Sequence, residues 1–311
     1  MNIKTVALIG AGAVGSYMLW GLSEKLGENL WVVAEGERRM RLLQEGLYVN
    51  EQPLKLHVKT PKEAHGADLA VVCTKYGDLQ DVQNMLTDIV EEHTIVLSLM
   101  NGVDSEEIIG NHIGMEHMLY GLIKIASSRK GNHVWFDSEK TLGIVYGSAE
   151  EGTAFADEAC GAVEALFADT PLKSRKSKEI LKEIWQKYAF NVSYNLPQAI
   201  LGCGVGVYRD SIYAAKLRDH LRDEVCAVAA ARGIDISERS DIEKMDCPSA
   251  PQARYSTLQD LDAKRRTEIE MFAGTMIRLG KETGVLTPYN EFAYLAIKAL
   301  EEKNQGMFEY L

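Results

Sequence analysis

The chain has 311 residues, of which 46% are hydrophobic and 25% are charged, so it can bury a sizeable core, and its length favours two domains over one. Asp and Glu outnumber Lys and Arg by 45 to 34. The resulting formal net charge of −11 argues against a surface for nucleic acid or anionic membranes, so an anionic ligand must be met by local positive groups.

Cysteine usage favours a reducing compartment. The five cysteines lie far apart, without a CxxC pair or a Cys/His cluster, so we expect reduced, buried thiols, a cytoplasmic protein and no metal site. The apolar stretch "VALIGAGAVG" near the start fits a folded strand, turn and helix better than a signal peptide. No apolar run is long enough to span a membrane.

Four continuous apolar runs in the first half are typical of parallel strands that are covered on both faces. They are residues 4–10, 29–35, 68–74 and 94–100. Segments with helical periodicity lie between them, which predicts an α/β domain with a doubly wound, Rossmann-type sheet.

A last strand over residues 141–148 and one more helix complete the predicted α/β domain, after which helical patterns take over. We place the boundary near Thr170–Pro171. The sequence thus predicts a dinucleotide-binding domain over 1–170 and an all-helical substrate and catalytic domain over 171–311.

Three glycines follow the first predicted strand as Gly10-x-Gly12-x-x-Gly15 and open an amphipathic helix. In that context Gly10 makes the tight turn, Gly12 lets the backbone approach a pyrophosphate, and Gly15 allows close packing of helix and strand. The helix N-terminus also favours an anion. The alternative is a glycine-rich turn without a ligand, which this context disfavours. The predicted cofactor loop comprises Gly10, Ala11, Gly12, Ala13, Val14 and Gly15.

Polar residues end the third and fourth predicted strands, at the edge where open α/β sheets bind ligands. Lys75 follows the third strand and Asn101 follows the fourth. On the residues alone, a ligand-binding role for Asn101 and a purely structural role in an Asn-Gly turn are equally well supported. Taken alone, Lys75 is better explained as a solvent-exposed lysine than as a residue that binds a ligand.

The segment "WQKYAFNVSYNLPQAI" places Lys187, Asn191 and Asn195 in an otherwise apolar helical run. At about 3.6 residues per turn the three side chains fall within roughly 80° of one another and form one polar stripe. The stripe either faces water or lines a site. The helix alone favours the solvent-facing alternative, because lone lysines are usually exposed.

Five segments occur in an order and at spacings that resemble the ketopantoate reductase (2-dehydropantoate 2-reductase) family, over nearly the whole chain. They are "GAGAVGSY", "CTKYGDL", "SLMNGV", "WQKYAFNVSYN" and "YSTLQDLDAKRRTEIEMFAG". The resemblance implies reduction of the ketone of 2-dehydropantoate to D-pantoate with NADPH, on the pantothenate and coenzyme A pathway. It also implies an active site between a nucleotide domain and a helical domain.

The resemblance assigns roles to polar residues already noted and to two more. It implies that Lys187 is the catalytic lysine and that Glu268 completes the active site. Residues implied to contact substrate or cofactor are Asn191, Asn195, Ser256, Asn101 and Lys75. Elementary chemistry agrees, because hydride delivery to a ketone leaves negative charge on oxygen, which a positioned ammonium can stabilise and protonate.

The sequence departs from the family pattern at the cofactor. Glu35 ends the second strand, where members often carry an arginine for the cofactor's 2′-phosphate; an acidic residue there normally binds the ribose hydroxyls and repels that phosphate. Arg38 and Arg39 follow and could pair with a phosphate. Alternatively, Glu35 faces solvent and only caps the next helix. The family therefore implies NADP(H), whereas Glu35 slightly favours NAD(H).

A smaller departure is Pro197, which follows Asn195 one residue later than in the family pattern and should bend or end that helix.

Three functions remain in competition. The leading one is a 2-oxoacid reductase of ketopantoate type. The second is an NADH-linked D-2-hydroxyacid dehydrogenase that acts on another bulky 2-oxoacid, and the third is a non-catalytic NAD(P)-sensing protein. Retention of the whole catalytic set disfavours the sensor, which needs no proton donor. We expect a small-molecule 2-oxoacid as partner, with no nucleic acid or membrane, and the sequence is compatible with a homodimer.

Overall fold

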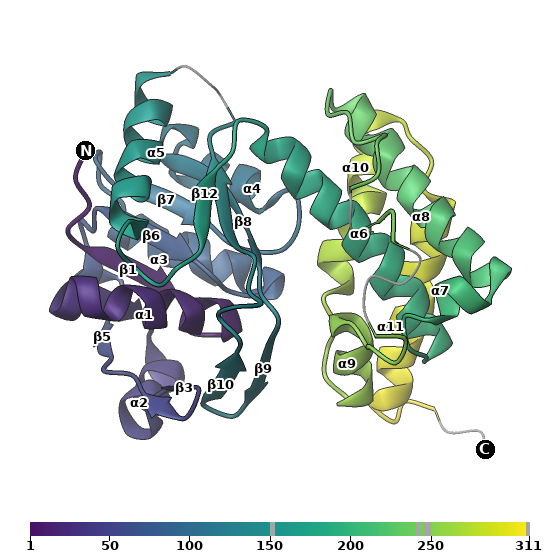
Figure 1. Cartoon of the computed structure of the whole chain (residues 1–311), viewed down its shortest axis with the longest axis horizontal. Coiled ribbons are helices and arrows are strands. Elements are labelled where there is room, and N and C mark those ends of the chain that lie inside the picture. Colours follow the sequence, from purple (N-terminus) through teal and green to yellow (C-terminus); the bar gives the residue numbers. More distant parts are fainter. Residues whose placement is uncertain (150–152, 241–242, 246–249, 309–311) are drawn as a thin grey trace. The chain divides into compact units, whose positions relative to one another are not determined.

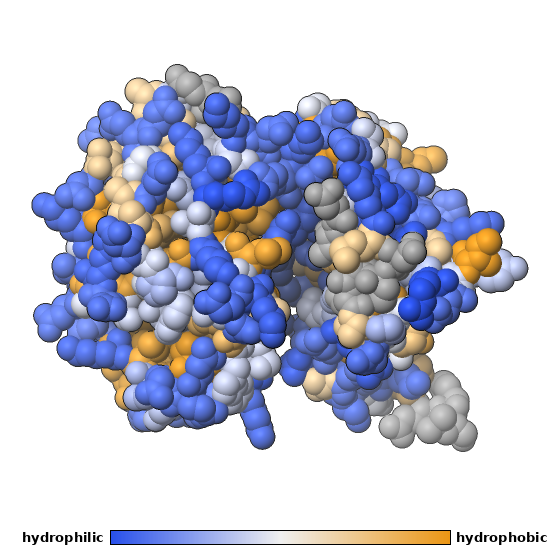
Figure 2. All heavy atoms as spheres, viewed as in Figure 1, coloured by the Kyte–Doolittle hydropathy of each residue, from blue (hydrophilic) through white to orange (hydrophobic). Residues whose placement is uncertain are grey.

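The protein is described by a computed structural model that covers residues 1–149, 153–240, 243–245 and 250–308. The fold consists of two compact units, Met1–Ile180 and Leu181–Leu311 (Figure 1). The division falls after the expected boundary at Thr170–Pro171, because strand β12 (Ser174–Lys176) pairs with β11 (Gly143–Gly147) and extends the sheet of the first unit. Hydrophilic residues cover much of the visible surface of both units (Figure 2).

The first unit is built on an eight-stranded sheet with the strand order β12-β11-β8-β7-β6-β1-β2-β5. Its other strands are β1 (Val6–Ile9), β2 (Leu30–Val33), β5 (His57–Lys59), β6 (Leu69–Val72), β7 (Ile95–Ser98) and β8 (Met118–Lys124). The strands from β5 to β8 are parallel, and β11 runs antiparallel to β8. The four apolar runs in the sequence form its centre, namely β2, β1, β6 and β7.

Helices cover both faces of this sheet, as the apolar runs predict. Alternate strand residues, such as Leu8 and Val71, pack under α1 (Ala13–Leu26) and α5 (Ala154–Phe167). Their neighbours Ala7 and Val72 pack on the opposite face, under α3 (Leu79–Ile89) and α4 (Ser105–Ile113). Since the central strands β1, β6 and β7 are buried on both sides, they need apolar side chains at almost every position. The first unit is therefore a doubly wound α/β fold.

A second, four-stranded sheet was not anticipated from the sequence. Its order is β4-β3-β10-β9, with β3 (Tyr48–Val49), β4 (Gln52–Pro53), β9 (Ser127–Lys130) and β10 (His133–Phe136). It brings together the segment after α2 (Gly36–Glu45) and a hairpin much later in the chain. Val49, Val134 and Phe136 bury this sheet against the α1 side of the core, so β9 contacts α1.

The described part of the second unit contains helices and connecting loops but no strand. Its elements are α6 (Ile180–Leu201), α7 (Val207–Asp210), α8 (Ile212–Ala231), α9 (Ser256–Asp262), a π-helix (Glu270–Gly274), α10 (Thr275–Thr283) and α11 (Pro288–Asn304). Helix α8 contacts α7, α10 and α11. None of the described helices is both long enough and apolar enough to cross a bilayer.

Helix α6 does not end at Pro197 but continues to Leu201. The proline removes one backbone donor to the carbonyl of Ser193. Every residue from 192 to 199 is buried, so tertiary packing holds this segment helical in spite of the missing bond. Of the two expected effects of Pro197, the end of the helix is therefore wrong, and a bend at that position stays a prediction.

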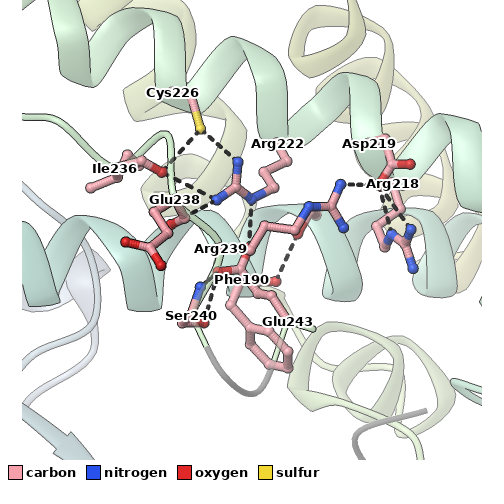
Figure 3. A network of polar contacts seen from close by, with 11 residues as sticks. Phe190, Arg218, Asp219, Arg222, Cys226, Ile236, Glu238, Arg239, Ser240 and Glu243 are labelled. Carbon is pink, nitrogen blue, oxygen red and sulfur yellow. Dashed lines mark hydrogen bonds and ion pairs between the residues drawn. The ribbon is translucent and has the colours of Figure 1, made fainter. Parts of the chain in front are cut away.

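A buried polar network fastens the segment after α8 to that helix (Figure 3). The Nε atom of Arg222 donates to Oε1 of Glu243 over 2.6 Å, and its terminal NH2 donates to the carbonyl of Ile236 over 3.1 Å. The other carboxylate oxygen of Glu243 accepts bonds from the backbone and hydroxyl of Ser240. Because both charged groups are buried, loss of either partner would leave the other as an unpaired buried charge. The network therefore helps to specify how this segment packs against α8.

The cysteines that the structure describes are free thiols. Cys73 and Cys160 are buried, whereas Cys203 and Cys226 are partly exposed. The expectation of buried thiols is therefore correct for the first two cysteines and wrong for the other two. Cys247 lies outside the described residues.

Candidate functional site

The glycine loop after β1 can be built only from glycine at two of its positions. Gly10 has φ +101°, and a Cβ there would lie 2.7 Å from the carbonyl carbon of Cys73. A Cβ on Gly15 would overlap the carbonyl oxygen of Gly10. The sequence therefore packs the first turn of α1 directly on the turn that precedes it.

The third glycine leaves space for a ligand. Gly12 is the N-cap of α1 and has no side chain to cap the helix, and the first turn contains no acidic residue. A Cβ on Gly12 would meet only the terminal NH1 of Arg129, at 3.7 Å. The first N–H groups of a helix have no partner within it and attract anions. The loop and the half-exposed Ala13 and Val14 thus fit a dinucleotide pyrophosphate.

The loops after β6 and β7 lie beside the glycine loop. The sheet pairing continues past both strands, since the N–H of Cys73 donates to Ile9 and that of Leu99 donates to Val72. The hydroxyl of Tyr76 donates to Oδ2 of Asp104 over 2.8 Å and ties the two loops together.

These loops carry Lys75, which is exposed, and Asn101, which is half-buried. Together with Gly10 they occupy the carboxyl ends of the three neighbouring strands β1, β6 and β7. The strand order reverses at β1. Sheets of this kind bind ligands beyond the carboxyl ends of the strands at the point of reversal.

The residues that follow β2 bear on the choice between NADH and NADPH, and the structure gives them different surroundings. Glu35 is exposed and is the N-cap of α2, but its side chain makes no capping hydrogen bond, so at this position it can favour the helix only through its charge. The guanidinium of Arg39 lies 3.6 Å from the carboxylate of Glu63. Of the two arginines singled out in the sequence, Arg39 is therefore engaged elsewhere, whereas Arg38 is near Arg129 and Arg41.

The polar stripe of α6 leads into the interior of the second unit. Lys187 and Asn191 are half-buried, and Asn195 is only 4% exposed. The Nδ2 of Asn195 donates to the hydroxyl of Ser256 over 3.4 Å. Ser256 begins α9, so the structure joins two candidate residues that are far apart in the sequence. A wholly solvent-facing stripe is thereby excluded.

Gln198 was not among the residues predicted from the sequence, although it continues this stripe beyond Asn195. Its side chain is fully buried, and its Nε2 donates to the carbonyl of Ala253 over 2.9 Å. Its Oε1 accepts the N–H of Tyr255 over 2.7 Å, directly before Ser256. Gln198 thus fixes the backbone that carries Ser256. Its helical spacing from Asn195 was the available signal.

A glycine turn after α6 supports the same segment. The N–H of Val205 donates to Ala253, and that of Gly206 donates to Pro251 over 2.9 Å. A Cβ on Gly204 would overlap the carbonyl oxygen of Pro251, so only glycine permits this close approach.

Glu268 lies in a segment that packs against α6. The hydroxyl of Tyr188, next to Lys187, donates to the carbonyls of Met271 and Phe272 over 3.1 and 2.5 Å. Both acceptors belong to the π-helix that begins two residues after Glu268. Short π-helical turns are frequent at functional sites, where they reorient side chains. Glu268, like Lys187, is half-buried.

Comparison with known proteins supports an enzyme of one family. A model described as ketopantoate reductase PanE/ApbA matches residues 6–149, and its C-terminal counterpart matches residues 179–301. A 2-dehydropantoate 2-reductase of Archaeoglobus fulgidus is 27% identical and one of Pyrococcus horikoshii is 28% identical; each alignment covers 97% of this chain and 99% of the relative.

A solved structure of similar fold is the ternary complex of D-mandelate dehydrogenase with NADH and anilino(oxo)acetate. It is 23% identical with a TM-score of 0.82, and the match covers 97% of this chain and 99% of that protein. Since the two family models span most of both units, the chain belongs to the ketopantoate reductase family of NAD(P)H-dependent oxidoreductases.

Proposed function

We propose that this chain reduces the ketone of 2-dehydropantoate with NAD(P)H to give D-pantoate, the reaction named for its relatives. The observation that carries the proposal is the half-buried stripe of Lys187, Asn191 and Asn195, with Ser256 hydrogen-bonded at its inner end. An ammonium, two amides and a hydroxyl suit a substrate that has a ketone oxygen and a carboxylate.

The bound cofactor would supply a hydride to the carbonyl carbon. Lys187 then stabilises the negative charge that develops on the ketone oxygen and gives it a proton. Asn195 and Ser256 hold the substrate carboxylate, with Asn191 between them and the lysine. Glu268 orients the ammonium. In the first unit, the glycine loop holds the pyrophosphate, while Lys75 and Asn101 contact cofactor and substrate.

A second candidate is an NADH-linked D-2-hydroxyacid dehydrogenase for another bulky 2-oxoacid. The exposed carboxylate of Glu35 favours it, because that side chain is available to accept hydrogen bonds from ribose hydroxyls and would repel a 2′-phosphate. The NADH complex of the structurally similar D-mandelate dehydrogenase is in line with this candidate. On these grounds we propose a modest preference for NADH over NADPH.

Steady-state kinetics with a panel of 2-oxoacids tests the proposal. The panel contains 2-dehydropantoate, a branched aliphatic 2-oxoacid and phenylglyoxylate, each with NADH and with NADPH. The highest kcat/KM with 2-dehydropantoate supports the main proposal, and the highest value with phenylglyoxylate supports the second candidate. Binding of dinucleotide without turnover of any 2-oxoacid would instead indicate a sensor.

The catalytic role of Lys187 gives the first prediction. Lys187→Ala should lower kcat by about 10²–10⁴-fold and leave the Kd of the cofactor nearly unchanged, since it removes a general acid and no cofactor ligand. The exposed Lys216 of α8 provides the matched control, and Lys216→Ala should keep wild-type kcat. A Lys187→Ala enzyme within threefold of wild type would remove this lysine from the mechanism.

A further inference from the structure

Two arginines of the first unit, Arg38 and Arg41, lie near a third, Arg129, which lies beside the glycine loop. Arg129, in the middle of β9, has its terminal NH1 3.7 Å from the point that a Cβ on Gly12 would occupy. Arg38 and Arg41 lie one turn apart on α2, so both project from the same side of that helix. The group therefore extends from the cofactor loop to the helix that follows β2.

The positive charges of Arg38 and Arg41 both reach the guanidinium of Arg129. Desolvation lowers the pKa of Arg129, and the positive charges of Arg38 and Arg41 lower it further. Within the described part of the chain, no carboxylate forms an ion pair with any of the three, although Arg39 on the same helix pairs with Glu63. Like charges without a counterion are unfavourable, and a bound anion relieves their repulsion.

The hairpin orients the arginine that lies nearest the loop. Arg129 pairs across the strands with Val134, which is fully buried and anchors β10 in the core. The Nε of Arg129 donates to the carbonyl of Gly131 over 2.9 Å, which fixes the plane of the guanidinium. Planar guanidinium groups bind phosphate oxygens through paired hydrogen bonds.

We propose that Arg129, Arg38 and Arg41 form an arginine subsite that binds a phosphate of the dinucleotide beside Gly12. The proposal rests on the proposed function only in taking NAD(P)H as the cofactor. Two phosphates share this chemistry, namely the pyrophosphate of both cofactors and the 2′-phosphate of NADPH. The subsite supplies the local positive charge that a chain of net charge −11 needs in order to bind such a ligand.

Equilibrium binding tests the subsite without reference to turnover. The Kd values of NADH and NADPH are measured by nicotinamide fluorescence on the full chain, at low and high salt. Arg129→Gln and Arg41→Gln should each raise Kd about tenfold or more at low salt, and Arg129→Lys should restore part of the loss, because it keeps the charge but not the planar group. The salt dependence of Kd should also become shallower.

Two controls match the tested residues in charge and position. Lys130→Gln removes a cation from the next residue of β9, whose side chain points to the other face of the strand. Arg39→Gln removes a guanidinium of α2 that pairs with Glu63 instead. Both controls should leave Kd within about twofold of wild type, and thermal unfolding should show that every variant is folded.

The two cofactors distinguish the two phosphates. Equal weakening of NADH and NADPH supports the subsite and assigns it to the pyrophosphate, which the position of Arg129 at Gly12 favours. Weakening of NADPH alone supports the subsite and assigns it to the 2′-phosphate. Unchanged Kd values in both arginine variants overturn it. Since binding is measured without substrate, failure of the subsite is separable from failure of the proposed reaction.

Discussion

Gln198 illustrates how one buried side chain supports a candidate substrate contact that it does not itself make. Gln198→Leu removes both hydrogen bonds to the 253–255 backbone and should loosen Ser256. We therefore expect KM for the 2-oxoacid to rise about tenfold, with a smaller fall in kcat and no change in cofactor Kd. Steady-state kinetics and cofactor titration on the same preparations measure all three quantities.

Ser256→Ala provides the comparison for this positioning role. It should raise KM in the same way, and adding Gln198→Leu to it should cost little more, because both changes remove the same contact. A Gln198→Leu enzyme with wild-type KM, or a double variant whose effects simply add, would show that the glutamine serves folding alone.

Single residues were predictable from the sequence where their chemistry was conspicuous against its surroundings. An ammonium and two amides in the apolar run of α6 were visible without a structure, and the resemblance supplied roles for them. Arg129 gave no such signal, because an arginine in a polar segment is ordinary until β9 is placed beside α1. Whether Glu35 caps α2 through a hydrogen bond also needed the structure, which shows no such bond.

At the scale of elements, a carboxylate of α8 accepts hydrogen bonds from the N-terminus of helix α11. The buried Glu224 accepts the backbone N–H groups of Tyr289 and Asn290 over 2.8 and 3.0 Å, and also the side-chain amide of Asn290. These donors are among those that a helix N-terminus leaves without an internal partner. The negative charge also complements the helix dipole.

Glu224→Gln should therefore destabilise the second unit by about 1–3 kcal/mol, the usual range for charge-assisted hydrogen bonds that are lost or weakened inside a protein. Urea denaturation with circular dichroism measures the change. Glu291→Gln is the matched control, since it neutralises an exposed carboxylate in the first turn of the same helix. Equal midpoints for wild type and Glu224→Gln would refute the capping role.

The sequence predicted the four strands at the centre of the large sheet, where burial on both faces forces a continuous apolar run, and it also predicted β11. It did not predict β8, although six of the seven residues of that strand are buried, and it did not predict β5. It also did not predict the four-stranded sheet, whose strands are two to four residues long and in which no residue of β9 or β4 belongs to the buried core. Such strands have no side-chain pattern of their own and exist because their partners are anchored elsewhere. Strand β12, also short and exposed, was missed for the same reason.

For the molecule as a whole, one buried carboxyl should tie folding stability to pH. Burial of Glu106 raises its pKa from about 4.5 to about 7, although a hydrogen bond from Ser105 opposes the shift. The folded protein therefore retains a proton between these two values that the unfolded chain has lost. The contribution of Glu106 to stability therefore falls as pH rises through this interval and levels off above about pH 7.

Replacing Glu106 with Gln keeps a neutral side chain at every pH. The Tm of Glu106→Gln relative to wild type should rise as pH is increased from 5 to 8, which differential scanning calorimetry can follow. Glu116→Gln, on an exposed side chain, should keep a constant offset from wild type across the same range. A pH-independent offset for Glu106→Gln as well would mean that Glu106 does not titrate there.

Strand β9 lies at the edge of its sheet and buries none of its four side chains, so no apolar face locks its register against β10. The left-handed turn at Gly131, with φ +62°, and the bond from the amide of Asn132 to the carbonyl of Glu45 determine that register instead. A slip by one residue would turn Arg129 to the opposite face and present Ser128 or Lys130 to Gly12. The length of a surface turn therefore decides which side chain lies beside the glycine loop. If the proposed arginine subsite binds the cofactor, insertions and deletions in that turn should change ligand affinity without altering any residue of the loop itself.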